Sequence, residues 1–489
     1  MGAVPSRAPI RAAAGAAGRS VVNDALTQAA MVRRGECSPL ELVDEAIARI
    51  EATNPSLNAV IHQRFERARD EALRAANGPF RGVPIVVKDS SCPIAGEPLH
   101  EGLQVAKDAG YRATVNSWLT DRLVGAGFII VGRTNVPELC THTTTEPAAY
   151  GPTRNPWATD RSAGGSSGGS GAAVAAGMVA IGHGTDGGGS VRTPAAFCGV
   201  VGLKPTRGRM SNAPDSAEHW AGLSTDGFLT RTVRDSAAVL DAVCGSSPGD
   251  PYTTALTASL AAALDGMLPR LRIGVRLRGA IDGDDAHPEV ARSIRQVADL
   301  LSAQGHAVVD ASPAALDEAE AITQQGIVVS ACVAAELDVW SARLGREIAL
   351  DEIEPRNRMS VSNGRTVTGT QYVAAREWLH GWGRRLHAWW SDFDLLLTPT
   401  VTQPPVLIGA LPFDPTVDDM ARMRRELGWL VGMWNVSGQP AISVPARQTI
   451  DGLPIGAQLV APWGREDLLL QTAALIEREQ PWPLVAKSA

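Results

Sequence analysis

The chain has 489 residues, which is long enough for one large α/β domain or for several small domains. A hydrophobic content of 44% and a charged content of 20% are typical of a globular protein with a large core. The net charge of −7, without a dense cluster of lysine and arginine, argues against a nucleic-acid partner. No apolar run approaches the roughly 18 residues that a membrane-spanning helix needs, so we expect no membrane partner.

The six cysteines are scattered, and no two of them form a CxxC pair. This pattern indicates neither a zinc site nor a disulfide framework, so we expect a reduced, cytoplasmic protein. Residues 1–19 are rich in alanine and predict a disordered tail. Gly2 and Ser6 match a short myristoylation pattern that is common by chance, and Pro5 and Arg7 interrupt any signal-peptide core.

The first half of the chain alternates between strand and helix patterns, starting near Ser20. A capping box at Ser38-Pro39-Leu40-Glu41 opens a helix that Asn54-Pro55 is expected to end. The alternation predicts an α/β fold, with a large mixed and mostly parallel central sheet covered by helices on both faces. The other elements predicted here are strands at 57–61, 83–89 and 128–131 and helices at 65–76 and 114–126.

The second half is more variable and begins near Pro248, after a strand at 200–203, a long loop at 207–226 and a helix at 232–243. The spacing of Tyr372, Leu379, Trp382 and Trp389 predicts one helix face, which suits core packing better than a stacking platform for a ligand. We expect one domain at 20–489, with a core at about 80–210 and a variable, substrate-shaping half at about 248–440. The remaining predicted elements are strands at 272–275, 307–309, 395–397, 441–444 and 455–460, and helices at 288–304, from about 315, and at 466–477.

Residues 163–193, AGGSSGGSGAAVAAGMVAIGHGTDGGGSVRT, hold two glycine-serine runs that flank an apolar segment. Because glycine has no Cβ, such runs turn sharply and let a substrate approach the backbone. Free N–H groups beside a serine hydroxyl are what an oxyanion hole requires. A flexible linker is the alternative, but linkers do not usually flank a buried segment. Ser166 and Ser190 are therefore the candidate functional serines.

Two features near these serines admit other interpretations. Residues 182–187, GHGTDG, satisfy the G-x-G-x-x-G pattern of a dinucleotide site, but Pro194 makes a following helix unexpected and no acidic residue falls about 20 residues on. His183 lies beside the site and is a formal candidate for a general base. A buried, hydrogen-bonded histidine is the better interpretation, since no acidic partner is recognisable behind it.

A serine nucleophile needs a base, and no histidine stands in a recognisable relation to Ser190. Lys88 ends an apolar strand, and burial there would lower the pKa of its amine enough for it to act as a base. A lysine at the end of a strand is more often solvated, or paired with a neighbour such as Asp89. The residue types alone leave both interpretations open.

Three segments together closely resemble the amidase signature family: the strand that ends in Lys88, GGSSGGSGAAVAAG at 164–177, and TDGGGSVRTPAAFCGVVGLKPTRGR at 185–209. Further similar segments lie at 227–241, 394–400, 435–445 and 451–470, so the resemblance extends from about Ser20 to Pro483. It implies the amidase signature fold, a serine hydrolase of amide C–N bonds, and no metal or organic cofactor.

The resemblance also implies roles for individual residues. Ser190 would be the nucleophile, Ser166 the bridging serine after a cis peptide bond, and Lys88 the base. The implied oxyanion hole consists of the N–H groups of Gly187, Gly188, Gly189 and Ser190, and the implied supporting residues are Ser167, Asp186 and Arg192.

The substrate is less constrained. The run at 143–157 is most similar to the branch of the family that contains 6-aminohexanoate cyclic-dimer hydrolase and related aryl-amide and urethane hydrolases, which implies a small amide, anilide or carbamate substrate. A glutamyl-tRNA amidotransferase A-type glutaminase subunit is the alternative. We expect a monomer or homodimer and a pocket shaped partly by the loop at 207–224. The candidate pocket residues are Thr141, Arg209, Met210, Trp220 and Cys332.

Overall fold

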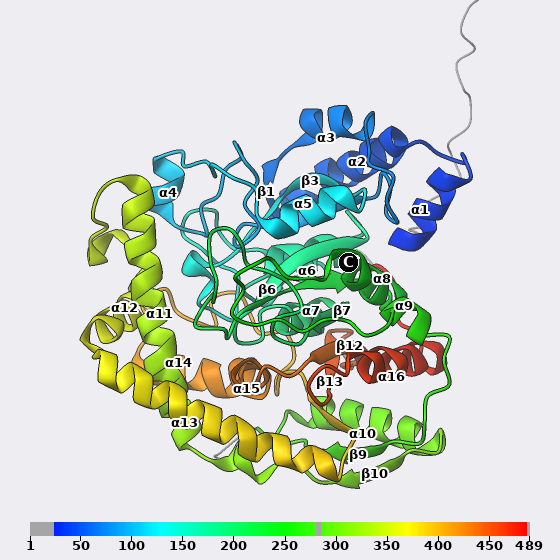
Figure 1. Cartoon of the computed structure of the whole chain (residues 1–489), viewed down its shortest axis with the longest axis vertical. Helices are drawn as coiled ribbons and strands as arrows, with labels where there is room; N and C mark the ends of the chain where they lie inside the picture. Colours follow the sequence, from blue (N-terminus) through cyan, green and yellow to red (C-terminus); the bar gives the residue numbers. More distant parts are fainter. Residues whose placement is uncertain (1–23, 280–284, 487–489) are drawn as a thin grey trace, which may run out of the picture.

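The computed structural model describes residues 24–279 and 285–486, so the predicted tail at 1–19 lies outside the described residues. An 11-stranded sheet crosses the protein in the order β1-β3-β2-β6-β8-β7-β12-β13-β11-β9-β10 (Figure 1). Its strands are β1 (Val60–Gln63), β2 (Pro84–Lys88), β3 (Ile129–Thr134), β6 (Ile181–Asp186), β7 (Val201–Lys204), β8 (Thr225–Thr230), β9 (Arg272–Val275), β10 (Ala307–Asp310), β11 (Leu395–Pro399), β12 (Ala441–Gln448) and β13 (Pro454–Val460). A separate two-stranded ribbon joins β4 (Arg154–Asn155) to β5 (Ala158–Ser162).

Helices cover this sheet on both faces. They are α1 (Ala25–Arg33), α2 (Pro39–Leu57), α3 (Phe65–Ala72), α4 (Gln104–Asp108), α5 (Trp118–Gly125), α6 (Gly168–Ala175), α7 (Arg192–Cys198), α8 (Val233–Val243), α9 (Leu260–Ala263), α10 (Pro288–Ala303), α11 (Glu320–Leu344), α12 (Pro355–Thr366), α13 (Gly369–Ala388), α14 (Val417–Met423), α15 (Trp429–Ser437) and α16 (Glu466–Glu479). Within the described ranges, none of these helices is both long and apolar enough to cross a membrane.

The sheet is mixed, as predicted, but it is not mostly parallel. Only the pairs β2–β3, β2–β6, β9–β10 and β9–β11 are parallel, whereas the other six pairs are antiparallel. The reason is that β12 and β13 form a hairpin and β8 returns between β6 and β7. A continuous apolar run indicates burial on both faces but does not fix strand direction.

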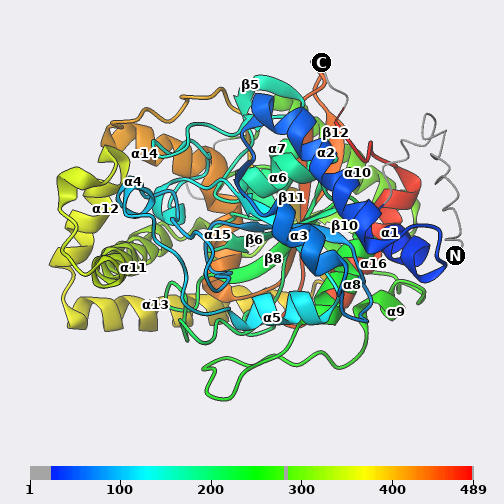
Figure 2. The ribbon, with the colours of Figure 1, turned by 90° about the horizontal axis from the view of Figure 1, so that it is seen from above.

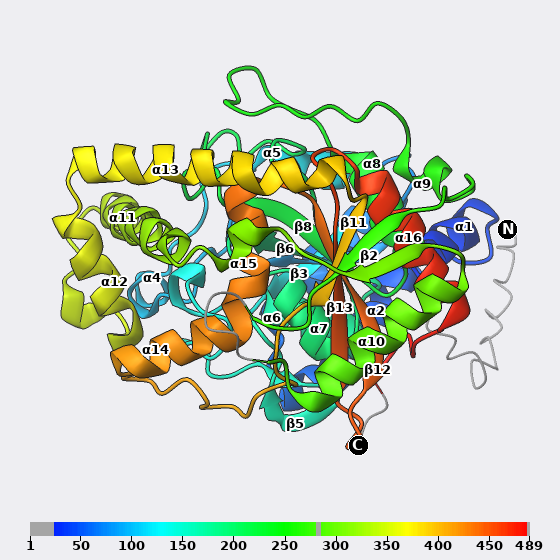
Figure 3. The same ribbon diagram turned by 90° about the horizontal axis from the view of Figure 1, so that it is seen from below.

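The two faces of the sheet have separate cores because successive side chains of a strand point to opposite sides. On β2, Ile85 and Val87 belong to the core that includes residues of α5, α8, α10 and α16, whereas Val86 belongs to the core that includes residues of α2, α6 and α7. Figure 3 shows the two groups of helices on either side of the central strands. Lys88 follows the same alternation and lies on the Val86 side, which is the side of α6 and α7.

The predicted helices and strands of the described chain have counterparts in the structure, with ends shifted by a few residues. Two local expectations were wrong. Helix α2 continues to Leu57 with Pro55 inside it, and the Asn54 side chain binds the backbone of Val60 just beyond the helix. Helix α7 begins at Arg192 despite Pro194, because the first turn of a helix tolerates the missing proline N–H.

Helices α11, α12 and α13 form a group at one end of the protein (Figure 2). On α13, Ala375, Leu379, Trp382 and Leu386 are buried in a core that also includes α15. This confirms core packing as the role of that helix face. The loop predicted at 207–226 ends earlier, because β8 begins at Thr225.

Candidate active site

Lys88 lies at the end of β2 and is fully buried. Its Nζ atom lies 2.7 Å from Ser166 Oγ and 2.5 Å from Thr185 Oγ1. Burial lowers the pKa of Lys88, and the negatively charged groups around it offset only part of this effect. Asp89, the adjacent carboxylate, instead accepts the backbone N–H groups of His100 and Glu101. The lysine therefore faces two hydroxyl groups and has no carboxylate as a direct partner.

Ser166 reaches Lys88 from a tight segment just before α6. The peptide bond between Gly165 and Ser166 is cis, as expected at this position. A Cβ atom on Gly165 would lie 2.7 Å from the carbonyl oxygen of Thr144, so a side chain does not fit there. The N–H of the next residue, Ser167, donates to the carbonyl oxygen of Ser190 at 3.1 Å. This bond joins the two glycine-serine runs.

The second run is held by Asp186 at the end of β6. The Asp186 carboxylate accepts the N–H of Gly189 at 2.7 Å and the Nη2 and Nε groups of Arg192 at 2.7 and 2.9 Å. Burial acts to raise the pKa of Asp186, but the Arg192 guanidinium holds it well below its usual range. Asn435 donates to the same carboxylate, and Gln458 accepts from Arg192. The turn that carries Ser190 is therefore fixed from three elements.

The structure corrects one part of the predicted oxyanion hole. Gly189 has a φ of +115° and lies against Val431, which explains the glycine, but its N–H is engaged by Asp186 and so is not available to a ligand. Within the described part of the chain, no hydrogen bond engages the N–H groups of Gly187, Gly188 or Ser190. These three remain candidates for oxyanion donors.

Ser166 and Ser190 line one cavity, which also contacts Thr185 and Gly187. Its opposite wall comes from His219, Trp220 and Ser224 in the loop at 207–224, and from α11. The end of that loop is therefore part of the cavity wall. The cavity brings together two serines that are 24 residues apart in the chain (190 less 166).

Ser167 supports the site through Thr185. Its hydroxyl donates to the carbonyl oxygen of Thr185 and accepts the N–H of the same residue, each at 3.3 Å. The second hydroxyl group in contact with the Lys88 amine belongs to Thr185, a residue for which the sequence predicted no role. Ser167 therefore positions the strand that carries Thr185 and does not contact the lysine amine.

His183 is a structural residue. Its Nδ1 atom accepts the backbone N–H of Lys88 at 3.4 Å, and its Nε2 atom lies 2.9 Å from Asp226 Oδ1. An acidic partner is thus present, contrary to expectation, but it lies on β8 and was not visible as a neighbour in sequence. Both ring nitrogens are engaged, so His183 supports the backbone of β2 and has no free nitrogen for a serine.

Of the five candidate pocket residues, only Trp220 lines the serine cavity. Arg209 is buried in an ion pair with Glu466 at 2.7 Å and also donates to backbone carbonyl groups, so it is structural. Met210 belongs to the hydrophobic core. The sequence of the loop at 207–224 does not show which of its side chains face the cavity and which face the core.

The other two candidates also lie outside the wall of the cavity. Thr141 donates to Asn357 Oδ1 at 2.6 Å, which ties its hydroxyl to α12. Cys332 packs on α11 against the core of α13, and burial raises the pKa of its thiol to about 11. A different cysteine, Cys140, lines the cavity. All six cysteines are free.

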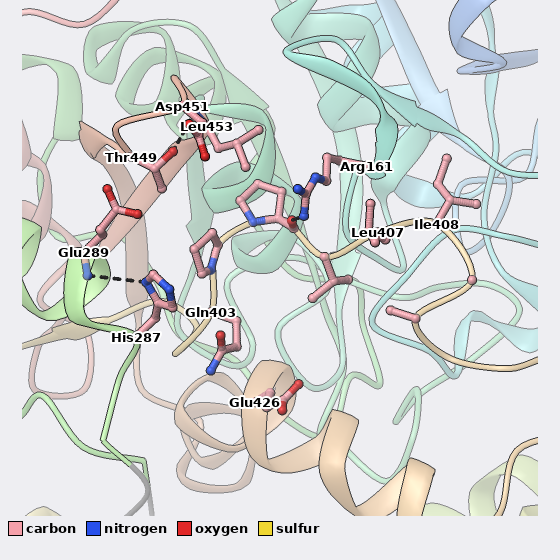
Figure 4. Close-up of a pocket in the computed structure, with 15 residues that line it drawn as sticks. Arg161, His287, Glu289, Gln403, Leu407, Ile408, Glu426, Thr449, Asp451 and Leu453 are labelled. Carbon is pink, nitrogen blue, oxygen red and sulfur yellow. Dashed lines mark hydrogen bonds between the residues drawn. The ribbon is translucent and has the colours of Figure 1, made fainter.

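A larger hollow of about 1080 Å³ lies on the surface away from these serines. Figure 4 shows it between His287 and Glu289, the segment at 403–410, and the hairpin that carries Thr449 and Asp451. The figure marks the N–H of Glu289 donating to His287 Nδ1 at 3.4 Å and the N–H of Leu453 donating to Thr449 Oγ1 at 3.0 Å. No serine-base pair lies in it, so the smaller cavity is the candidate active site.

The family model described as Amidase matches residues 41–470, which includes every residue of this cavity. The chain belongs to the amidase signature family. It is an amidase, a hydrolase of amide bonds. A curated relative, 6-aminohexanoate-cyclic-dimer hydrolase of Paenarthrobacter ureafaciens, is 42% identical over 470 residues, which cover 94% of this chain and 95% of the relative.

Solved structures of amidase signature enzymes resemble this one closely. A structure of 6-aminohexanoate cyclic dimer hydrolase complexed with substrate has a TM-score of 0.91 at 40% identity, covering 95% of this chain and 98% of that chain. A bacterial aryl acylamidase of the amidase signature family has a TM-score of 0.84 at 28% identity, covering 94% and 96%. The fold of this amidase is therefore shared along almost the whole chain.

Several polar residues of the amidase site were missed from the sequence. Asn435 and Gln458 fix Asp186 and Arg192, and both lie in segments at 435–445 and 451–470 whose resemblance was noted without assigning a role. Glu101 and Glu336 line the cavity but carry no local motif. The packing of α11 reveals Glu336, and the path of the segment after β2 reveals Glu101.

Proposed function

We propose that this amidase cleaves C–N bonds of small amides, anilides or carbamates through an acyl-enzyme on Ser190, with Ser166 as the proton bridge and Lys88 as the base. The observation that carries the proposal is the 2.7 Å contact between Lys88 Nζ and Ser166 Oγ at the wall of the cavity that also contains Ser190. A fully buried amine with a lowered pKa supports the role of a base.

In the first step, Ser190 Oγ attacks the carbonyl carbon while its proton passes to Ser166, whose own proton passes to Lys88. The negative charge on the carbonyl oxygen is stabilised by the N–H groups of Gly187, Gly188 and Ser190. The C–N bond then breaks, and the leaving nitrogen takes the proton back from Lys88 through Ser166. A water molecule hydrolyses the ester on Ser190 by the same proton route in reverse.

Carbamates fit the same proposal because they present the same carbonyl carbon with an additional alkoxy oxygen. Similarity to a hydrolase of a 6-aminohexanoate cyclic dimer and to an aryl acylamidase favours small amides and anilides as the substrate class. In this proposal the amidase acts alone, as a monomer or homodimer, and needs no nucleic-acid or membrane partner.

The test is a substrate panel with the purified protein alone: 4-nitroanilides, aliphatic amides, carbamates, esters and glutamine. We expect turnover of anilides or amides that the Ser190→Ala variant lacks. Activity restricted to glutamine would instead support a glutamyl-tRNA amidotransferase A-type subunit, and activity retained by the variant would contradict the role of Ser190.

A further inference from the structure

Two carboxylates form part of the wall of the serine cavity. Glu101 comes from the segment that follows β2, and Glu336 comes from α11. Both also border an adjoining hollow of about 640 Å³ that extends toward Asn212 and Arg343. The pair therefore lies where the serine cavity meets the space beside it.

Glu101 is held in place by its surroundings. The residue is 8% exposed, its backbone has a φ of +49°, and its N–H donates to Asp89 Oδ2 at 3.1 Å. Its Oε2 atom accepts the indole N–H of Trp340 at 2.9 Å. One carboxylate oxygen is therefore fixed by a neutral donor, and no cation of the described chain forms an ion pair with Glu101.

Glu336 has no hydrogen-bond donor among the described residues. His219 Nε2 and Arg343 Nη1 each lie 4.0 Å from its carboxylate, which is beyond hydrogen-bond distance. Burial and the charge of Glu101 raise the pKa of Glu336 to about 8, and Arg343 offsets this only in part. Its ion pair with Arg343 is therefore at the outer limit of ion-pair distance, and a buried charge normally has a closer partner.

A third acceptor faces the same space. The Ser90 hydroxyl is 2% exposed and lines the serine cavity, and it has no hydrogen-bond partner among the residues that the structure describes, although it lies near the Cys140 thiol. Buried polar groups are normally hydrogen-bonded, so an unpaired hydroxyl at a ligand cavity indicates a group that a ligand engages. The cavity wall thus presents Glu336 and Ser90 as acceptors without a donor at hydrogen-bond distance among the described residues.

We propose that Glu336 and Glu101 bind a protonated amino group on the acyl part of the substrate, so that this amidase prefers ω-amino acyl amides. The inference rests on the proposed function, since it takes the serine cavity as the place where the amide is cleaved. An ammonium group supplies three donors in a compact cation, which matches two carboxylates and a hydroxyl in one wall.

Cleavage of a cyclic amide would also place an ammonium group in this cavity. When Ser190 Oγ bonds to the carbonyl carbon of a cyclic amide and the C–N bond breaks, the released amine stays attached to the acyl group. It first takes the proton that Ser190 gave up and then a second proton from solvent, which makes it an ammonium. Binding this cation at Glu336 would hold it away from the new ester and prevent the ring from closing again.

The experiment compares two 4-nitroanilides of equal acyl length, 6-aminohexanoyl and heptanoyl, which differ only in a terminal ammonium or methyl group. We expect wild-type protein to prefer the 6-aminohexanoyl compound by about tenfold or more in kcat/KM, as a charge-assisted hydrogen bond would give. Glu336→Gln should lower this ratio about tenfold. Asp338→Asn, on the same helix with a side chain 70% exposed, is the matched control and should leave the ratio unchanged.

Equal cleavage of the two compounds by wild-type protein would overturn the inference and leave the proposed function intact. A fall in both rates by the same factor in Glu336→Gln would also overturn it, because that result indicates general damage. Calorimetric binding to the Ser190→Ala variant tests the inference without turnover: 6-aminohexanamide should bind more tightly than heptanamide. Equal affinity would contradict ammonium recognition even if neither anilide were cleaved.

Discussion

The amine of Lys88 lies 2.7 Å from the hydroxyl of Ser166, and the surrounding structure leaves the lysine no carboxylate as a direct partner. The adjacent Asp89 is turned away, with one oxygen on two backbone N–H groups and the other 3.8 Å from Arg133. A neutral amine in this position has a lone pair for the Ser166 proton. In the proposed mechanism, this arrangement lets a lysine take the place of the usual histidine base.

Removal of the nucleophile gives the most direct prediction. Ser190→Ala should lower kcat on an anilide by about 10⁴-fold or more, because loss of a member of a catalytic triad removes covalent catalysis. The melting temperature should stay near the wild-type value, since the turn is fixed by Asp186 and Arg192 and not by the serine hydroxyl. Steady-state kinetics and thermal unfolding measure the two effects. Wild-type turnover in the variant would remove Ser190 from the mechanism.

Lys88→Met tests the base. The variant should lose activity to a similar extent, while wild-type kcat/KM should rise with pH and reach a plateau below the usual lysine value of 10.5, because burial lowers the pKa of Lys88. Between the lowered pKa and 10.5, unfolding takes up a proton, so this lysine makes wild-type stability rise with pH. The methionine variant lacks this dependence. A pH-independent difference in unfolding free energy between the two proteins would contradict a neutral Lys88.

Much of the fold could be predicted from the sequence because its signals are local. The capping box at Ser38 and the spacing of buried residues on α13 predict helices correctly. Strand direction could not be predicted in this way. The return of β8 between β6 and β7 depends on the path of the intervening chain, which an apolar run does not encode.

In the candidate site, too, some residues could be predicted from the sequence and others could not. Ser166, Ser190 and Lys88 stand in segments that resemble the family. Thr185 opens one of these segments, but its contact with Lys88 follows only from β6 lying beside β2 in the sheet. Gly189 was assigned to the oxyanion hole from its place in a glycine run. Its N–H is engaged by Asp186, a side-chain contact that the run itself does not reveal.

The Thr185 hydroxyl should position the Lys88 amine, and a variant without this hydroxyl tests that role. Thr185→Val leaves the volume nearly unchanged but deletes the partner at 2.5 Å, so we expect kcat to fall about 10- to 100-fold with a smaller change in KM. Thr185→Ser restores the hydroxyl and should recover most of the lost kcat. Steady-state kinetics of wild type and the two variants on one anilide measure the separate changes in kcat and KM. Wild-type kcat in Thr185→Val, which keeps a γ-methyl group, would mean that the hydroxyl does not position Lys88.

The Asp186–Arg192 pair should stabilise the turn that carries the nucleophile. Asp186→Asn leaves Arg192 buried without its counter-ion, which we expect to cost about 3–5 kcal/mol of unfolding free energy and to reduce kcat. Because Arg192 holds the pKa of Asp186 below its unfolded value of 3.8, the stabilisation is present above that pH and is lost as the pH falls further.

Urea unfolding at pH 7 and below pH 4 measures this contribution, and the difference between wild type and variant should shrink at the lower pH. The control is Asp467→Asn, which breaks the pair with Arg465 at 2.9 Å where the two side chains are 35% and 47% exposed. Solvent screens such a pair, so the control should change stability by less than about 1 kcal/mol. If both substitutions had the same small effect at pH 7, the buried pair would not be what holds the turn of Ser190.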